Sequence, residues 1–175
     1  MKQRASAMES GMARKATVKV STKQKPCRYL GAGLPNVYLV GVEYMIDPET
    51  GDQSVGIPRL PALLHALAQA VFAKKGLLTG DELRFLRKRL RMPSKDFAVL
   101  VGVTPEQYSR LENGATITPT MDRLVRLLYI ALAKLPAKAA VEVARASWMA
   151  ERDHAQRIIA SWDENHNWIV KTKAA

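Results

Sequence analysis

Apolar residues recur every three or four positions over much of the chain, and this spacing predicts a succession of amphipathic helices. The first predicted helix runs from Leu60 to the Lys74-Lys75-Gly76 break. The second starts at Thr79, because Thr79 and Glu82 have the spacing of a capping box. Helical spacing continues as far as residue 162, so the chain is predicted to be mainly α.

A tight turn joins the next two predicted helices. The first of them covers about 94–101, and Gly102 ends it where a left-handed backbone is needed. Thr104, Pro105 and Gln107 then supply an N-cap, a first-turn proline and a capping-box partner, so a new helix must begin there. The order helix, helix, tight turn, helix is the arrangement that places a helix in a DNA groove.

A different pattern precedes these helices. Residues 36–43 (NVYLVGVE) are β-branched or aromatic at half of their positions, DPETGD supplies a turn, and QSVGIP offers a second short strand that Pro58 ends. A β-hairpin is expected, held together by Val37, Leu39, Val55 and Ile57. The predicted fold class is therefore mainly α with a small N-terminal β-hairpin.

Both ends of the chain depart from these patterns. Residues 1–26 carry seven basic residues, one acid and few large apolar groups, which predicts an arm without fixed structure. Such an arm could contact DNA, and a solubilising tail fits equally well. After Pro136 a rough helical stripe predicts a C-terminal helix, followed by a loose tail from Asp163. The stripe consists of Val141, Ala144, Trp148, Ala155, Ile159 and Trp162.

These patterns divide the chain into five predicted parts. The parts are a basic arm over 1–26, a β-hairpin module over 27–58, a connecting helix over 59–78, a DNA-binding domain over 79–135, and a C-terminal helix and tail over 136–175.

The formal net charge of +11 and the pI of about 10.0 predict an anionic partner, nucleic acid before an acidic membrane surface. The longest apolar runs, 60–72 and 124–135, are interrupted by polar groups and are too short to span a membrane, so no membrane partner is expected. The N-terminus lacks the apolar core of a secretory signal, and Cys27 alone cannot form an internal disulfide. A cytoplasmic location is expected.

No group of residues predicts catalysis. His65, His154 and His166 are scattered without ligand spacing, there is no glycine-rich phosphate loop, and no serine or cysteine has the sequence setting of a nucleophile. We therefore expect neither enzyme activity nor a cofactor.

The helix that begins after Thr104 has an apolar and a polar face. Tyr108 and Leu111 form the inner face. Arg110 can donate two hydrogen bonds to guanine and Glu106 can accept one from cytosine, so these two are the predicted base readers. Gln107 has two possible roles, since its side chain could cap the helix with Thr104 or contact DNA. The outward residues are Pro105, Glu106, Ser109 and Arg110. A polar helix that merely faces water is the competing interpretation, and the coincidence of turn, caps and positive charge argues against it.

The segment LRFLRKRLRMPSKDFAVLVGVTPEQYSRLENG, about Leu83 to Gly114, resembles the Cro/C1-type (Xre-like) helix-turn-helix of phage repressors and bacterial regulators. The resemblance implies a lambda-repressor-like helical bundle. It also implies an ion pair between Arg87 and Glu112 that ties the first helix of the unit to the end of the recognition helix.

The implied DNA contacts follow the same motif. Thr104 caps the recognition helix, Glu106 and Arg110 face bases, and Asn113 lies against phosphate. Relatives usually have Ser-Gln where this chain has Pro93-Ser94, so Ser94 and Lys95 would replace the usual phosphate contact. Pro105 stands where relatives often carry a polar base reader, and proline offers only apolar contact, for example to a thymine methyl group.

The wider arrangement is similar to MqsA-like antitoxins and their HigA-like relatives, whose N-terminal modules often read Cys-Pro-x-Cys-Gly at the hairpin turn. This chain reads Asp47-Pro48-Glu49-Thr50-Gly51, so the zinc corner cannot be built. Asp47, Glu49 and Asp52 could attract a hard cation, but a solvated acidic turn is the favoured interpretation and no metal site is predicted. Cys27 is expected to be a small buried or half-buried side chain.

The leading hypothesis is a sequence-specific transcriptional regulator, a repressor that binds a two-half-site operator on double-stranded DNA as a homodimer. The first alternative is an antitoxin that binds a toxin protein through residues 27–75, although a chain of charge +11 would repel a basic toxin. The second is a non-specific nucleic-acid packaging protein. Dimerisation could use the helix from Pro119 to Pro136, the C-terminal helix or the hairpin edge, in that order.

Overall fold

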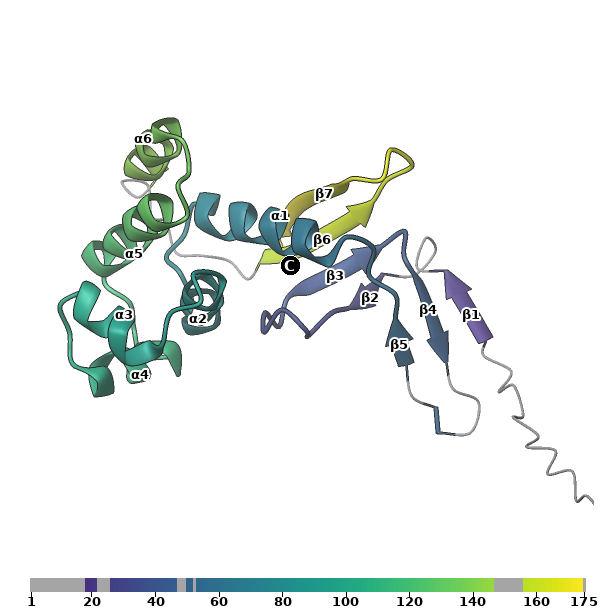
Figure 1. Ribbon diagram of the computed structural model, residues 1–175, viewed down its shortest axis with the longest axis horizontal. Helices are drawn as coiled ribbons and strands as arrows, with labels where there is room; N and C mark the ends of the chain where they lie inside the picture. The colour runs from purple at the N-terminus through teal and green to yellow at the C-terminus, as the bar shows by residue number, and fades with distance from the viewer. Residues whose placement is uncertain (1–17, 22–25, 47–49, 52, 147–155, 175) are drawn as a thin grey trace, which may run out of the picture.

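The fold consists of a helical part and a strand part that the long helix α1 joins (Figure 1). The structure is a computed structural model and describes residues 18–21, 26–46, 50–51, 53–146 and 156–174. None of the helices in these residues is long and apolar enough to cross a membrane. The helices are α1 (Leu60–Ala73), α2 (Gly80–Arg89), α3 (Ser94–Leu100), α4 (Pro105–Glu112), α5 (Pro119–Leu132) and α6 (Ala137–Ala146). The predicted fold class, mainly α with a small β part, is confirmed.

Helices α2 to α5 share one apolar core. Thr79 forms the predicted capping box: its hydroxyl accepts from the Glu82 backbone N–H at 3.3 Å, and Glu82 Oε2 accepts from the Thr79 backbone N–H at 2.8 Å. The largest fully buried side chains of this core are Leu83, Leu86, Phe97, Tyr108 and Val125. All five helices from α1 to α5 begin within a residue of their predicted starts, because each start has its own local signal.

The strands form two separate sheets. They are β1 (Val18–Ser21), β2 (Cys27–Arg28), β3 (Val37–Val40), β4 (Glu43–Ile46), β5 (Gln53–Val55), β6 (Gln156–Trp162) and β7 (Trp168–Ala174). The first sheet has the order β1-β4-β5 and is antiparallel throughout. The second has the order β2-β3-β6-β7, in which β3 and β6 are parallel and the other pairs antiparallel.

A hairpin forms between β4 and β5 around the predicted turn, but the expected first strand contributes only Glu43 to it, and Val37 and Leu39 lie in the other sheet instead of stabilising the hairpin. The expected single strand over 36–43 breaks at Gly41 into β3 and β4, which belong to different sheets. Gly41 has a φ of 82°, and a Cβ atom there would lie 2.5 Å from the Trp162 carbonyl oxygen. Glycine is required at this bend because β6 passes so close to it.

The prediction of one C-terminal helix and a loose tail is wrong from residue 156 onward. Residues 137–146 are helical, but residues 156–162 form strand β6, and the expected tail forms strand β7. β6 lies beside β3, with Ala160 opposite Leu39. This parallel pairing joins residues about 120 positions apart, so no local signal marks it. Trp148 and Ala155 of the predicted stripe lie outside the described residues.

Part of the predicted basic arm is also a strand. Residues 18–21 form β1, which pairs antiparallel with β4 and so satisfies backbone groups that β4 would otherwise expose. This pairing corrects the expectation of an arm without fixed structure at these positions. Apart from Pro26, the remaining residues of 1–26 lie outside the described part of the chain.

Helix α1 is a packed layer on the four-stranded sheet and more than a connector. Leu63, Leu67 and Val71 are at most 1% exposed and belong to one core cluster with Leu39 of β3. At the start of the helix, the Trp168 indole Nε1 donates to the Pro58 carbonyl oxygen at 2.9 Å. Strands β2 and β3 therefore share one sheet and one covering helix with β6 and β7, and residues 80–146 are inserted between the two pairs of strands.

A buried ion pair on α5 holds the link between α1 and α2. Arg126 Nε donates to Asp122 Oδ2 at 2.9 Å, and both side chains are at most 3% exposed. The same guanidinium donates to the carbonyl oxygens of Phe72, Lys74 and Gly76. Charge-assisted hydrogen bonds of this kind are the stronger ones, so the helical part has a fixed attachment to α1.

Candidate nucleic-acid interface

Helix α4 is capped in its first turn by its own side chains. Thr104 Oγ1 accepts from the Gln107 backbone N–H at 3.2 Å, and Gln107 Oε1 accepts from the Thr104 backbone N–H at 3.0 Å. Pro105 occupies the first helical position, where no N–H is needed, and Gly102 makes the preceding turn with a φ of 72°. The side-chain oxygen of Gln107, Oε1, therefore belongs to the cap. Its side-chain nitrogen, Nε2, remains available to donate to DNA.

Tyr108 fixes the inner face of α4 against α3. Its side chain is fully buried, and its ring centroid lies 5.4 Å from that of Phe97 at an interplanar angle of 53°. Burial raises the pKa of the Tyr108 hydroxyl, so the group stays neutral around neutral pH. Leu111 on the same side is half-buried. Rotation of α4 about its axis is therefore restricted, and the opposite face stays outward.

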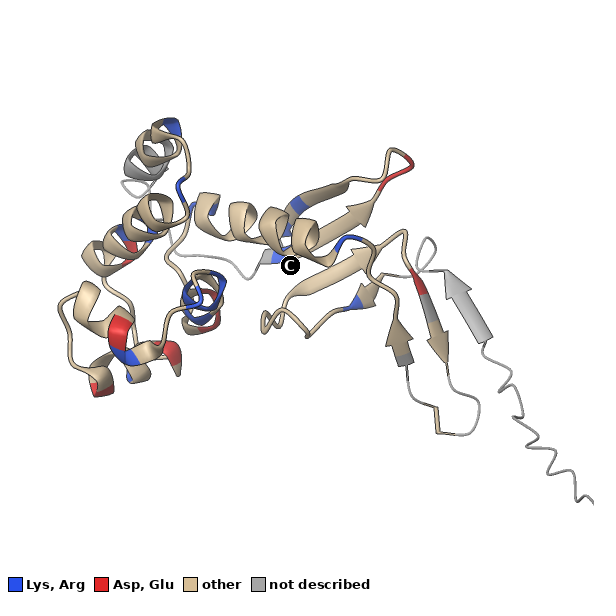
Figure 2. Ribbon diagram, viewed as in Figure 1, with Lys and Arg blue, Asp and Glu red and all other residues tan. Residues whose placement is uncertain are grey.

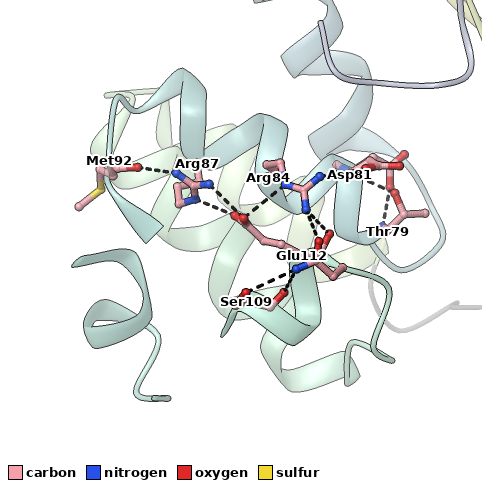
Figure 3. A network of polar contacts seen from close by, with 9 residues as sticks. Thr79, Asp81, Arg84, Arg87, Met92, Ser109 and Glu112 are labelled. Atoms are coloured by element: carbon pink, nitrogen blue, oxygen red, sulfur yellow. Dashed lines mark hydrogen bonds and ion pairs between the residues drawn. The ribbon is translucent and has the colours of Figure 1, made fainter. Parts of the chain in front are cut away.

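The end of α4 is tied to α2 by a buried ion pair (Figure 3). Arg87 Nε donates to Glu112 Oε1 at 2.7 Å, and Arg87 Nη2 donates to Glu112 Oε2 at 3.0 Å. The remaining terminal nitrogen, Nη1, donates to the Met92 carbonyl oxygen at 2.8 Å. The hydrogen bond to Glu112 raises the pKa of Arg87, so the pair stays ionised. These two residues are the pair that the family resemblance implies.

Arg84 is a second arginine on Glu112, and sequence reasoning missed it. Its Nε donates to Glu112 Oε2 at 3.4 Å, and its Nη2 donates to the Glu112 carbonyl oxygen at 2.9 Å and to Asn113 Oδ1 at 2.8 Å (Figure 3). Its Nη1 also lies 3.5 Å from Asp81 Oδ1. The only signal in the sequence was that Arg84 stands one helical turn before Arg87, which is too common to identify it.

Asn113, a predicted phosphate contact, has an engaged side chain. Its Oδ1 accepts from Arg84, and its Nδ2 donates to the Ser109 carbonyl oxygen at 2.8 Å. The Asn113 side chain therefore closes the last turn of α4 before Gly114. A role for Asn113 at phosphate stays a prediction, and it would require the amide to share or exchange these partners.

The outward face of α4 consists of Pro105, Glu106, Ser109 and Arg110, all exposed. The pKa of Glu106 is lowered, first by its own backbone N–H and then by the Thr104 hydroxyl and the charge of Arg110, so the carboxylate is ionised near neutral pH. The Arg110 guanidinium makes no hydrogen bond or ion pair with any residue in the described part of the chain. The face thus presents one acceptor and one donor a single helical turn apart.

The start of α3 lies where the sequence predicts it, at Ser94. Pro93 occupies the N-cap position and provides no side-chain hydrogen bond, as expected for the departure from the usual serine. Ser94 is half-buried and Lys95 is exposed, so Lys95 is the better placed of the two to meet a phosphate. Farther along α3, Val99 is 75% exposed, which is unusual for a valine in a helix of a folded domain.

Comparison with known protein families agrees with this geometry. Residues 83–128 match the family model described as helix-turn-helix, which is of the Cro/C1 type. The matched segment is a DNA-binding helix-turn-helix of the kind found in transcription regulators. The match includes most of α2, all of α3 and α4, and most of α5. No curated protein and no solved structure gives a significant match to the chain. The resemblance of the N-terminal module to antitoxins stays a prediction, because the match does not extend to it.

The predicted acidic turn contains three carboxylates. Asp47, Glu49 and Asp52 all lie outside the described residues. In the part of the chain that is described, no three His, Cys, Asp or Glu side chains are grouped as metal ligands. Cys27 is half-buried in β2, as its size and character suggest.

Proposed function

We propose that this protein is a sequence-specific regulator of transcription that reads double-stranded DNA with α4. The observation that supports this role is the exposed pair Glu106 and Arg110, one turn apart on a helix whose start, inner face and end are each held by packing or hydrogen bonds. Arg110 can donate to guanine O6 and N7, and Glu106 can accept from cytosine N4. Preorganisation lowers the conformational entropy lost when these groups meet base edges.

We further propose that the protein acts as a homodimeric repressor. One α4 contacts few base pairs, so useful affinity requires a second copy on a related half-site. Helices α5 and α6 pack against each other and carry Leu127, Leu132 and Val141, which are 44%, 45% and 51% exposed. Exposed apolar side chains on adjacent helices favour a two-fold interface. A dimer bound over a promoter would exclude the polymerase.

Binding-site selection with the wild type and Arg110→Ala tests the assignment of α4. The wild type is expected to enrich one sequence with two related half-sites. Arg110→Ala should lose base preference at one position in each half-site, where discrimination should fall by about 1–3 kcal/mol. An Arg110→Ala motif identical to the wild-type motif would contradict base reading by this residue. If the wild type enriches no sequence, the proposed function itself is wrong.

Lys95→Ala is the matched control, because it also removes one exposed cation of the helix-turn-helix. A phosphate contact carries no sequence information, so the Lys95→Ala motif should be unchanged. Its affinity should fall alike for all sequences, and the slope of log K against log salt should decrease in magnitude by about 0.9.

A further inference from the structure

The four-stranded sheet β2-β3-β6-β7 has one covered face and one open face. Helix α1 packs on the first, and Leu39, Ile158 and Ala160 on that side are at most 3% exposed. Since side chains alternate along a strand, the residues between them point to the other side. We name the opposite side the open sheet face and define it by Arg28, Tyr38, Arg157, Ile159, Lys171 and Lys173.

Strand register places these residues side by side. Arg28 pairs with Tyr38, Tyr38 with Ile159, and Ile159 with Lys171, so one row crosses all four strands. Arg157 pairs with Lys173 in the adjacent row. The four cationic side chains are exposed, and Tyr38 and Ile159 are half-exposed. The edge strands β2 and β7 therefore carry Arg28, Lys171 and Lys173, and the inner strands β3 and β6 carry Tyr38, Ile159 and Arg157.

The charge of the open sheet face has one sign. Its four cations have no acid among them, and the acids of the β6–β7 hairpin, Asp163 and Glu164, lie in the turn at one end (Figure 2). Arg28 Nε donates to the Pro35 carbonyl oxygen at 3.0 Å, which orients its guanidinium and leaves the terminal nitrogens available. Such a surface selects a partner with several negative charges.

The apolar centre distinguishes between polyanions. The Arg157 guanidinium carbon lies over the Tyr38 ring, 5.6 Å from its centroid, so a planar cation and an aromatic ring lie together beside Ile159. A duplex presents its phosphates but encloses its base faces, whereas unpaired bases offer planar apolar surfaces that stack on aromatic and guanidinium groups. A partner that matches both parts of this face has phosphates and exposed bases together.

We propose that the open sheet face binds single-stranded nucleic acid, RNA or DNA, with bases over Tyr38, Arg157 and Ile159 and phosphates at Lys171, Lys173 and Arg28. A sheet of this width accommodates about two or three bases. This surface is separate from α4 and does not require that α4 read an operator.

Fluorescence anisotropy of the full chain with labelled dT12, rU12 and a 12-base-pair random duplex tests the proposal. Lys171→Glu/Lys173→Glu should weaken single-strand binding at least tenfold and lower the magnitude of the salt slope by about 1.4, at about 0.7 per phosphate contact. Tyr38→Leu should weaken it at least about fivefold without a change of charge. Comparing dT12 with rU12 tells whether DNA or RNA is preferred.

Two controls make the result specific. Lys75→Glu/Lys138→Glu makes the same change of charge at exposed positions outside the open sheet face and should alter single-strand binding less than threefold. Arg110→Ala should leave it unchanged, so failure of the proposed operator reading and failure of this proposal are distinguishable. All variants keep residues 1–26, so the basic N-terminus contributes equally to each. Circular dichroism melting confirms that each variant is folded.

Three outcomes would overturn the proposal. The first is the absence of measurable single-strand binding by the wild type. The second is equal weakening in Lys171→Glu/Lys173→Glu and in Lys75→Glu/Lys138→Glu. The third is a random duplex that binds as tightly as dT12 and rU12 and responds equally to Tyr38→Leu, which would make the face a phosphate surface alone.

Discussion

At the scale of single residues, the end of α4 depends on a carboxylate that two arginines share. Arg87 binds both oxygens of Glu112 within the core, whereas Arg84 reaches the same residue from the surface and is 32% exposed. Both interactions are arginine–carboxylate pairs, and they differ mainly in how far solvent reaches the arginine. Burial makes the loss of a partner costly, because the remaining charge cannot be solvated.

Glu112→Ala should therefore lower the free energy of unfolding by about 3–5 kcal/mol, because it leaves the Arg87 guanidinium buried without its counterion. Arg84→Ala should cost about 1 kcal/mol or less, since this arginine is partly solvated. Urea unfolding followed by circular dichroism gives both values. Replacing the pair together, in Arg87→Met/Glu112→Leu, should recover part of the loss. If Glu112→Ala and Arg84→Ala lower the free energy of unfolding equally, the buried ion pair does not contribute more to stability than the partly exposed one.

At the scale of elements, helices and strands differed in how far the sequence determined them. Thr79 and Thr104 mark the starts of α2 and α4, because each forms a capping box with a residue three positions later. β6 has a period-two pattern in Ile158, Ala160 and Trp162, but Ile159 is apolar as well, so helical spacing fits the same letters. The turn residues 163–167 between two tryptophans were the one local indication of a hairpin.

The same contrast applies to the candidate site. The outward face of α4 followed from its caps and apolar spacing, because those signals are local and the motif is specific. The roles of Arg84 and Asn113 could not be read in this way, since they depend on how α2 meets the end of α4 in three dimensions. The open sheet face was hidden for a similar reason: its strands come from both ends of the chain.

At the junction between α1 and α2, one side chain, that of Arg126, holds three backbone carbonyl oxygens. Arg126→Lys keeps the positive charge but cannot hold three carbonyl oxygens and a carboxylate at once. We expect a loss of about 3 kcal/mol or more of unfolding free energy. The Leu78 amide, which donates to Asp122 Oδ1 at 2.8 Å, should also exchange hydrogen faster.

Arg110→Lys is the control for the junction, because it makes the same substitution at an exposed position. It should leave both the unfolding free energy and the exchange of the Leu78 amide within measurement error. If Arg126→Lys behaves like Arg110→Lys, the attachment of the helical part to α1 does not depend on the guanidinium.

At the scale of the whole molecule, the helical part is an insertion in a sheet. β2, β3 and α1 precede it and β6 and β7 follow it, so the strand part is complete only when both ends of the chain are present. Elements that follow one another along a chain usually lie side by side in space. The β3–β6 pair is an exception, because β3 and β6 are far apart in the sequence. α4, the helix that we propose reads DNA, and the basic open sheet face are therefore parts of one connected chain (Figures 1 and 2).

A pair of substitutions in β6 tests this architecture against the helical interpretation of the same residues. In the sheet, Ala160 is fully buried against α1 while Ile159 points to the open face and is half-exposed. In the helix that the sequence pattern suggested, Ile159 faces inward with Ala155 and Trp162. Ala160→Asp should therefore lower the unfolding free energy by several kcal/mol, at least about 3, because it buries a carboxylate without a partner. Ile159→Asp should cost about 1 kcal/mol, beside Lys171 on a solvated face. Thermal and urea unfolding that ranked Ile159→Asp as the more damaging change would favour the helix and remove β6 from the sheet.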